Sequence, residues 1–290
     1  MTEERSAGRR RALVLGGGGN LGAAEVGFVR RIEELGIAVD LVVGTSAGAL
    51  NAAHVAFHPD PDHDCLREIW AGLDGRQLFH RNIPRIAFTL LRSRMSLYDD
   101  SFVRDLVAEH LPDDDFASAR VPLYITAGNL RTGERHIFSE GSVLDAILAS
   151  TAIPGLMPPV RIGDDLFVDG GVVNPTDIDA AIELGATEVI AIDLGRGLDE
   201  RTPGNIVEVL TRAYAMLAER RTMCVVEHAE HQAALVHIRP GLTTDSASNF
   251  ADADRLIEQS YSMACTIFEQ CWDGERLRPG SYELAVSSGV

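Results

Sequence analysis

Short apolar runs alternate along the chain with longer segments in which apolar residues recur every three or four positions. A run of three to seven apolar residues that ends at glycine or at a polar residue is typical of a buried strand, and the longer spacing is typical of a helix packed on one side. The strands predicted in this way are 12–15, 41–43, 123–127, 136–138, 166–168, 188–194 and 234–238. The predicted helices are 21–35 (capped by Asn20), 47–57, 143–149, 176–184, 205–231 and 251–271, with an irregular helical region over 64–110.

Alternation of strands and helices predicts an α/β fold with a mostly parallel central sheet and helices on both faces. We expect one domain over 11–272, in which 12–195 carries the motifs described below and 200–272 is the helical C-terminal part. Residues 1–10 are expected to form a disordered tail, and 273–290 a second, poorly ordered tail. The helix at 205–231 is expected to pack internally, although a dimer face stays open, so the oligomeric state is not predicted.

Composition narrows the class of protein. The chain has 290 residues, of which 46% are hydrophobic and 24% charged, as in an ordinary globular protein. A net charge of -17 repels phosphate backbones and argues against nucleic acid as a partner. The four cysteines form no C-x-x-C pair, so no zinc site is expected. The sequence has neither an apolar N-terminal segment nor a run of about 18 apolar residues, which predicts a cytoplasmic protein.

The first candidate for chemistry is Gly44-Thr45-Ser46-Ala47-Gly48, which fits G-x-S-x-G between a predicted strand and a predicted helix. In that context the pattern holds the serine at a sharp turn with its hydroxyl exposed, and the flanking glycines avoid collisions with neighbouring backbone. A serine that merely caps a helix is the structural alternative. We interpret Ser46 as a nucleophile.

A glycine-rich stretch, Gly16-Gly17-Gly18-Gly19-Asn20-Leu21-Gly22, follows the first strand and opens a helix. Backbone N–H groups at such a junction favour an anion, and in acyl transfer they would form an oxyanion hole. The stretch also fits the dinucleotide-binding pattern G-x-G-x-x-G. That pattern needs an acidic residue at the far end of the second strand, whereas Asp40 stands before it. The position of Asp40 therefore disfavours a dinucleotide site.

Asp169-Gly170-Gly171 ends another predicted strand, at the sheet edge where sites cluster in such folds. A serine hydroxyl needs a base, and a carboxylate becomes more basic when it is desolvated. The two glycines leave room for a serine to approach. An ordinary Asp-Gly turn is the alternative. A triad completed by His228, His231 or His237 also stays open, although the first two lie in a predicted helix rather than in a loop.

Four segments in order resemble the patatin-like phospholipase family: LGGGGNLGAAEVGFVRRIEELGI, GTSAGAL, ASTAIPGLMPPV and DGGVVNPTDIDAAIELGATEVIAIDLG. The resemblance implies a three-layer α/β/α fold and hydrolysis of lipid acyl esters without metal or cofactor. It implies a Ser46–Asp169 dyad in place of a triad. It further assigns Gly17, Gly18 and Gly19 to the oxyanion loop and Gly22 to the position that closes this loop.

Two positions depart from the family pattern. Leu21 stands where the family usually has Arg or Lys, and Glu25 stands where a histidine is common. The missing cation weakens the expectation of an anionic headgroup near the loop. Acyl transfer to an acceptor other than water, including thioester chemistry, would use the same dyad and stays open. A non-enzymatic lipid-binding protein is a third reading, against which the intact motifs argue.

A basic and apolar segment lies at 76–97, with five arginines, no acidic residue and interleaved large apolar residues that include Ile83, Ile86, Phe88, Leu90, Leu91, Met95 and Leu97. In an acidic protein this composition suggests either an acyl-binding cap or peripheral contact with an anionic membrane. A helix packed on the core with its arginines in solvent is the alternative. The arginines are Arg76, Arg81, Arg85, Arg92 and Arg94.

Overall fold

The computed structural model describes residues 8–58, 63–73, 75, 95–195, 202–204, 206–242 and 250–284. Its strands are β1 (Arg11–Leu15), β2 (Leu41–Thr45), β3 (Leu123–Asn129), β4 (Arg135–Phe138), β5 (Val160–Ile162), β6 (Asp165–Asp169), β7 (Glu188–Ile192), β8 (Ala234–Arg239) and β9 (Gly280–Glu283). Its helices are α1 (Ala23–Glu34), α2 (Ala47–Phe57), α3 (His63–Gly72), α6 (Ser101–His110), α7 (Val143–Ser150), α8 (Ile178–Glu183), α9 (Ile206–Ala229) and α10 (Ala253–Cys271). Short 3-10 turns lie at η1 (Gly19–Gly22), η2 (Phe116–Ser118) and η3 (Gly170–Val172).

The strands form one sheet whose hydrogen-bonded neighbours run β5-β6-β3-β2-β1-β7-β8-β9, with β4 also paired to β3. The pairs from β3 through β2, β1, β7 and β8 to β9 are parallel. Antiparallel pairing is confined to β4, β5 and β6. The mostly parallel sheet predicted from the sequence is therefore confirmed, while the short strand β5 was not predicted.

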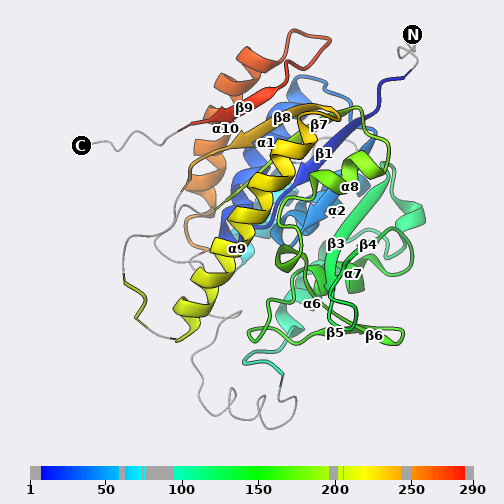
Figure 1. Cartoon of the computed structure of the whole chain (residues 1–290), viewed down its shortest axis with the longest axis vertical. Coiled ribbons are helices and arrows are strands. Elements are labelled where there is room, and N and C mark those ends of the chain that lie inside the picture. Colours follow the sequence, from blue (N-terminus) through cyan, green and yellow to red (C-terminus); the bar gives the residue numbers. More distant parts are fainter. Residues whose placement is uncertain are drawn as a thin grey trace.

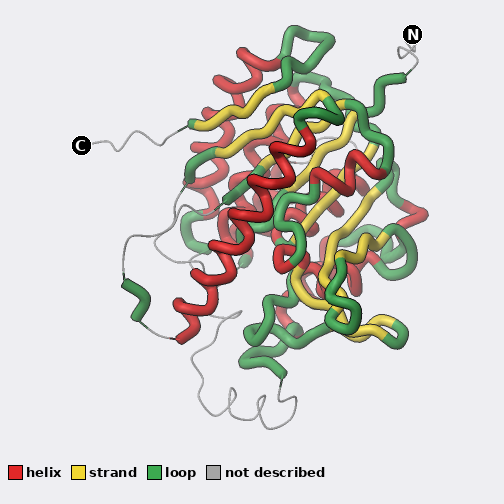
Figure 2. The backbone as a smooth tube through the Cα atoms, in the orientation of Figure 1, coloured by secondary structure: helices red, strands yellow, loops and turns green. Residues whose placement is uncertain are grey.

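Two hydrophobic layers sandwich the sheet, because alternate residues of each strand point to opposite faces. Leu13 and Leu15 of β1 pack in the larger cluster with α1, α2 and α10, whereas Ala12 and Val14 pack in the smaller cluster with α8 and the C-terminal part of α9. Figure 1 shows α8 and α9 in front of the sheet and the other three helices behind it. The tube in Figure 2 shows the same three layers, which confirms the α/β/α arrangement.

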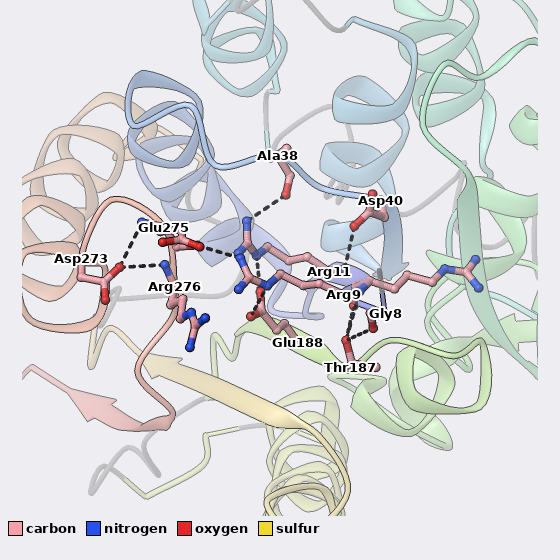
Figure 3. A network of polar contacts seen from close by, with 11 residues as sticks. Gly8, Arg9, Arg11, Ala38, Asp40, Thr187, Glu188, Asp273, Glu275 and Arg276 are labelled. Carbon is pink, nitrogen blue, oxygen red and sulfur yellow. Dashed lines mark hydrogen bonds and ion pairs between the residues drawn. The ribbon is translucent and has the colours of Figure 1, made fainter. Parts of the chain in front are cut away.

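Residues 8–10, at the described end of the predicted N-terminal tail, contact other parts of the protein. The N–H of Arg10 donates to Thr187 Oγ1 at 3.0 Å, and Arg9 donates to the carbonyl of Glu275 at 3.0 Å. Figure 3 shows Arg9 and Arg11 converging on Glu188, with Arg11 at 2.6 Å from its carboxylate. Residues 8–10 therefore differ from the disordered tail predicted over 1–10, because hydrogen bonds of Gly8 and Arg10 with Thr187 and the ion pair of Arg9 with Glu188 hold them beside β7.

The predicted C-terminal tail is also wrong in part, because β9 adds a parallel strand to β8 at the edge of the sheet. The chain reaches this edge through a bridge between Trp272 and Leu277, and Leu277 is buried. The strand escaped sequence analysis because GSYE shows no apolar run. Two helix boundaries differ as well: Asn20 lies in η1, with Gly22 at the N-cap position of α1, and α8 begins at Ile178 after a cap by Asp177.

We predict that deleting 273–290 destabilises the protein. The deletion removes β9 and the buried Leu277 side chain, and burial of one leucine contributes about 2 kcal/mol. Urea unfolding should show a loss of at least about that size. The matched deletion of 285–290 leaves β9 intact and should unfold as the full chain does. Equal midpoints for the full chain and the longer deletion would contradict a structural role for β9.

Candidate active site

The paths of β2 and β6 along β3 bring Ser46 and Asp169 together. Strand β4 occupies one edge of β3 opposite Thr126 and Ala127, so β2 and β6 must share the other edge. On that edge Thr45 lies opposite Thr126 and Asp169 lies opposite the next residue, Ala127. The C-terminal ends of β2 and β6 therefore meet. The Ser46 hydroxyl donates to Asp169 Oδ2 at 2.7 Å, and both side chains are buried.

Ser46 adopts a strained backbone conformation. Its φ of 54° makes it the one non-glycine residue with positive φ among the residues that the structure describes. Such a conformation costs on the order of 1–3 kcal/mol and persists only where neighbours enforce it. Here the Ser46 N–H donates to Ser150 Oγ at 2.8 Å, and Ser150 Oγ donates in turn to the carbonyl of Thr126 at 2.7 Å. Ser150, at the end of α7, thus ties the serine turn to β3.

Asp169 is surrounded by donors but is removed from water. Its Oδ1 accepts from the Gly171 N–H at 2.8 Å and from the Tyr214 hydroxyl at 3.2 Å. Burial raises the pKa of Asp169 from 3.8 to about 6, against the opposing effects of the hydrogen bonds from Ser46, Gly171 and Tyr214. Burial also raises the pKa of Tyr214, so its hydroxyl stays a donor. Asp169 is thereby a stronger base than a free carboxylate and is ionised at neutral pH.

The glycine loop lies beside Ser46. A Cβ built on Gly17 would lie 3.2 Å from Ser46 Cβ, so this loop and the serine are in close approach. The Gly17 N–H donates to the carbonyl of Pro175 at 2.7 Å. It is therefore already engaged, although the sequence predicted it as one of the N–H donors of the oxyanion hole. Within the described part of the chain no acceptor is found for the N–H groups of Gly18 and Gly19. The candidate oxyanion donors are therefore these two amides.

Close approach of neighbouring backbone or side-chain atoms explains the glycines that flank the motifs. A Cβ on Gly48 would overlap the carbonyl of Leu15, so glycine lets α2 start directly against the end of β1. A Cβ on Gly171 would overlap the Tyr214 hydroxyl, so glycine lets that hydroxyl reach Asp169. The same kind of overlap is found at Gly22, Gly44 and Gly170.

The two departures from the family pattern are both buried. The side chain of Leu21 is 2% exposed and packs in the core, so this position does not present a group to solvent. Glu25 accepts from Asn51 Nδ2 at 2.7 Å, and the same nitrogen donates to the carbonyl of Gly22 at 2.9 Å. Burial raises the pKa of Glu25 well above its ordinary value, which favours the neutral acid. Through Asn51, these hydrogen bonds connect the end of the glycine loop to α2.

None of the candidate histidines joins the serine and the aspartate. The Ser46 hydroxyl bonds Asp169 directly, His228 bonds Gln232, and His237 lies 3.2 Å from Asp193. His231 is exposed. In the described parts of the chain, no group of three His, Cys, Asp or Glu side chains is placed to hold a metal ion. The candidate site thus contains one carboxylate base, that of Asp169, one hydroxyl, that of Ser46, and backbone N–H donors.

Sequence reasoning missed Ser150 and Tyr214. Ser150 is the last helical residue of the segment ASTAIPG, and Tyr214 lies 45 residues beyond Asp169 in α9. Neither carries a local pattern that marks a site, so only the fold brings them in. The basic segment predicted to form a cap or membrane contact lies largely outside the described residues. Of its residues, 95–97 are described: Met95 is 50% exposed and Leu97 is partly buried.

A family model described as patatin-like phospholipase matches residues 13–182 of the chain. The protein therefore belongs to the patatin-like phospholipase family, as the four ordered segments predicted. Both the serine turn and the Asp-Gly-Gly turn lie inside the matched region.

Several curated relatives extend this result. An uncharacterized NTE family protein of Mycobacterium tuberculosis is 37% identical over 196 residues, which are 66% of this chain and 31% of that protein. Mouse patatin-like phospholipase domain-containing protein 7 is 26% identical over 283 residues, 89% of this chain and 20% of the relative. Lysophospholipase nte1 of Aspergillus terreus is 28% identical over 221 residues, 73% of this chain and 14% of the relative. The chain thus spans a third or less of each relative.

Among solved structures, VipD from Legionella pneumophila aligns with 90% of this chain and 67% of its own, at 13% identity and a TM-score of 0.48. The type III effector ExoU aligns with 91% of this chain and 53% of its own, at 16% identity and a TM-score of 0.45. Within the described residues, no helix combines the length and the apolar character that crossing a bilayer requires.

The raised pKa of Asp169 predicts where, on the acidic side, the rate of any reaction that uses this carboxylate as a base falls with decreasing pH. The base works only when ionised, so kcat/KM should rise with pH, reach half its maximum near pH 6 and level off above it. Tyr214→Phe removes a hydrogen bond that favours the ionised form, so it should move the midpoint to higher pH. The pH profile with a soluble nitrophenyl ester measures both effects. Tyr261→Phe, distant in the fold, is the matched control, and a midpoint near 4 would contradict this role of burial.

Ser150→Ala should weaken the serine turn. The change leaves the buried Ser46 N–H without its acceptor, which costs about 1–3 kcal/mol. Unfolding measurements should show that loss, and kcat should fall while KM changes little. Thr151→Ala removes only a hydroxyl that bonds carbonyls of the preceding helix α7, and it serves as the control. Full kcat in Ser150→Ala would show that the turn holds its shape without this bond.

Proposed function

We propose that the chain is a lipid acyl-ester hydrolase in which Ser46 is the nucleophile and Asp169 the base. One observation carries the proposal: the strained Ser46 donates its hydroxyl directly to a buried carboxylate at 2.7 Å, with no histidine between them. A serine hydroxyl becomes a competent nucleophile when an adjacent base takes its proton, and a carboxylate with a pKa of about 6 is such a base near neutral pH.

In the first half of the reaction, Asp169 Oδ2 accepts the hydroxyl proton and Ser46 Oγ bonds to the ester carbonyl carbon. The carbonyl electrons move onto its oxygen, where the N–H groups of Gly18 and Gly19 would stabilise the negative charge. One such donor is worth about 2.7–4 kcal/mol in the transition state. The tetrahedral species collapses, the alcohol leaves with the proton from Asp169, and acyl-Ser46 remains.

In the second half, Asp169 takes a proton from water, whose oxygen attacks the acyl carbon. Collapse breaks the bond to Ser46 Oγ, the serine recovers its proton from Asp169, and the fatty acid is released. The second oxygen of the carboxylate stays bound to Gly171 and Tyr214 throughout, which keeps the first oxygen aimed at the serine. No step needs a metal ion or a cofactor.

Family membership and relatives named phospholipase and lysophospholipase support a lipid ester as the substrate. Acyl transfer to an alcohol or a thiol would pass through the same acyl-serine, and added lysolipid would reveal it as a new diacyl product.

Single substitutions in the dyad test the proposal. Ser46→Ala and Asp169→Asn should each lower kcat for a nitrophenyl ester by at least about a thousandfold, because the nucleophile or its base is lost. A fluorophosphonate probe should label wild-type Ser46 and leave Ser46→Ala unlabelled. The double variant His228→Ala/His231→Ala should keep nearly full activity, since neither imidazole contacts the dyad. Retained activity in Asp169→Asn would remove the aspartate from the mechanism.

A further inference from the structure

Helix α9 carries large apolar side chains on the face that it turns to solvent. Its most exposed members, Ile206, Leu210 and Leu217, are 74%, 63% and 73% exposed. Isolated exposed apolar residues are ordinary, but a contiguous row along one helix face marks an interaction surface. We call this row the α9 stripe, and it consists of Ile206, Val209, Leu210, Met216, Leu217 and Met223.

The charges around the α9 stripe suit a lipid surface. In the first turns, the acidic side chain of Glu208 turns back to the N–H of Gly204 at 2.7 Å and does not lie in the row. The charges that follow within 206–223 are Arg212, Glu219, Arg220 and Arg221. Glu219 accepts from Arg239 at 2.8 Å, so both acidic side chains of this stretch face donors of the protein itself. Arg220 and Arg221 are exposed, and Arg221 also lies 3.0 Å from Asp179. An apolar helix face bordered by cations is typical of a segment that lies in a lipid interface. In a chain of net charge -17, such a border is a local exception.

The α9 stripe adjoins the dyad. Tyr214, whose hydroxyl bonds Asp169 at 3.2 Å, lies one turn after Leu210 and one turn before Leu217, so both leucines are its neighbours on the helix surface. Figure 1 shows the N-terminal half of α9 projecting from the front of the sheet. The helix that holds the carboxylate therefore also presents the apolar row.

We propose that the α9 stripe docks on a lipid surface and holds the Ser46–Asp169 pair against acyl esters in that surface. This inference rests on the proposed function, because it names how that site meets its substrate. It assigns a specific contact to residues 206–223, separate from the basic segment at 76–97.

The size of the stripe favours lipid over a second copy of the chain. Residues 206–223 span about 25 Å of helix, and one helix is about 10 Å wide. The area, about 250 Å², falls well below the roughly 800 Å² per partner that a stable protein interface buries. A lipid surface accepts a single amphipathic helix without such an extended interface.

Sedimentation with vesicles tests the proposal on the full chain. The vesicles contain phosphatidylcholine with a minor fraction of phosphatidylglycerol and lysophosphatidylcholine. Leu210→Gln/Leu217→Gln should lower vesicle partitioning and lysolipid hydrolysis by about tenfold, because two apolar contacts are lost. Turnover of a soluble nitrophenyl ester should stay within about twofold of wild type, since neither leucine contacts the dyad. Leu130→Gln, at a position 53% exposed in the turn after β3, is the matched control and should behave as wild type.

The outcomes separate this inference from the proposed function. Absence of ester turnover in wild type would defeat the proposed function, while vesicle partitioning still reports on the stripe. Failure of wild type to bind vesicles, or equal binding by the double variant, would overturn the docking proposal. A wild-type dimer that becomes monomeric in the double variant would assign the stripe to a second copy instead. Unchanged thermal unfolding of the double variant verifies that the fold is intact.

Discussion

The hydrogen bond between the Ser46 hydroxyl and Asp169 depends on how three strands meet. Strands β2 and β6 approach from opposite directions along one edge of β3, so their last residues come into contact. Around this junction, Ser150 fixes the serine turn and the glycines let backbone segments approach closely. Tyr214 reaches the far oxygen of the carboxylate from α9. The site is thus a property of the sheet, to which α7 and α9 each add one contact.

Burial gives this carboxylate its basicity and also imposes a cost. The rise in the pKa of Asp169 from 3.8 to about 6 corresponds to about 3 kcal/mol. Because the folded pKa is the higher one, the contribution of Asp169 to stability is fully present below pH 3.8 and is lost as pH rises through about 6. The ionised form that the proposed mechanism requires is therefore the less stable form. Hydrogen bonds from Ser46, Gly171 and Tyr214 offset part of this cost without removing the basicity.

The features that could be predicted from the sequence are those that a local sequence pattern marks. Ser46 follows a buried strand and precedes a helix of small residues, and Asp169 ends a strand before two glycines, so the sequence predicted both as candidates, and they lie 2.7 Å apart in the structure. Strand β9 and the anchoring of residues 8–10 were missed because ion pairs and edge pairing, rather than an apolar run, hold them. The assignment of Gly17 as an oxyanion donor did not foresee that Pro175 takes its amide. Such contacts join residues far apart in the chain and leave no periodic signal.

The covalent intermediate offers the most direct test of the central claim that Ser46 attacks the ester carbon. Wild-type protein is mixed with excess nitrophenyl ester, quenched in acid within the first turnovers and digested for mass spectrometry. The account predicts that the peptide containing Ser46 gains the mass of the acyl group, and that the adduct disappears on longer incubation without substrate. Steady turnover with no adduct on that peptide, or an adduct on another residue, would contradict it.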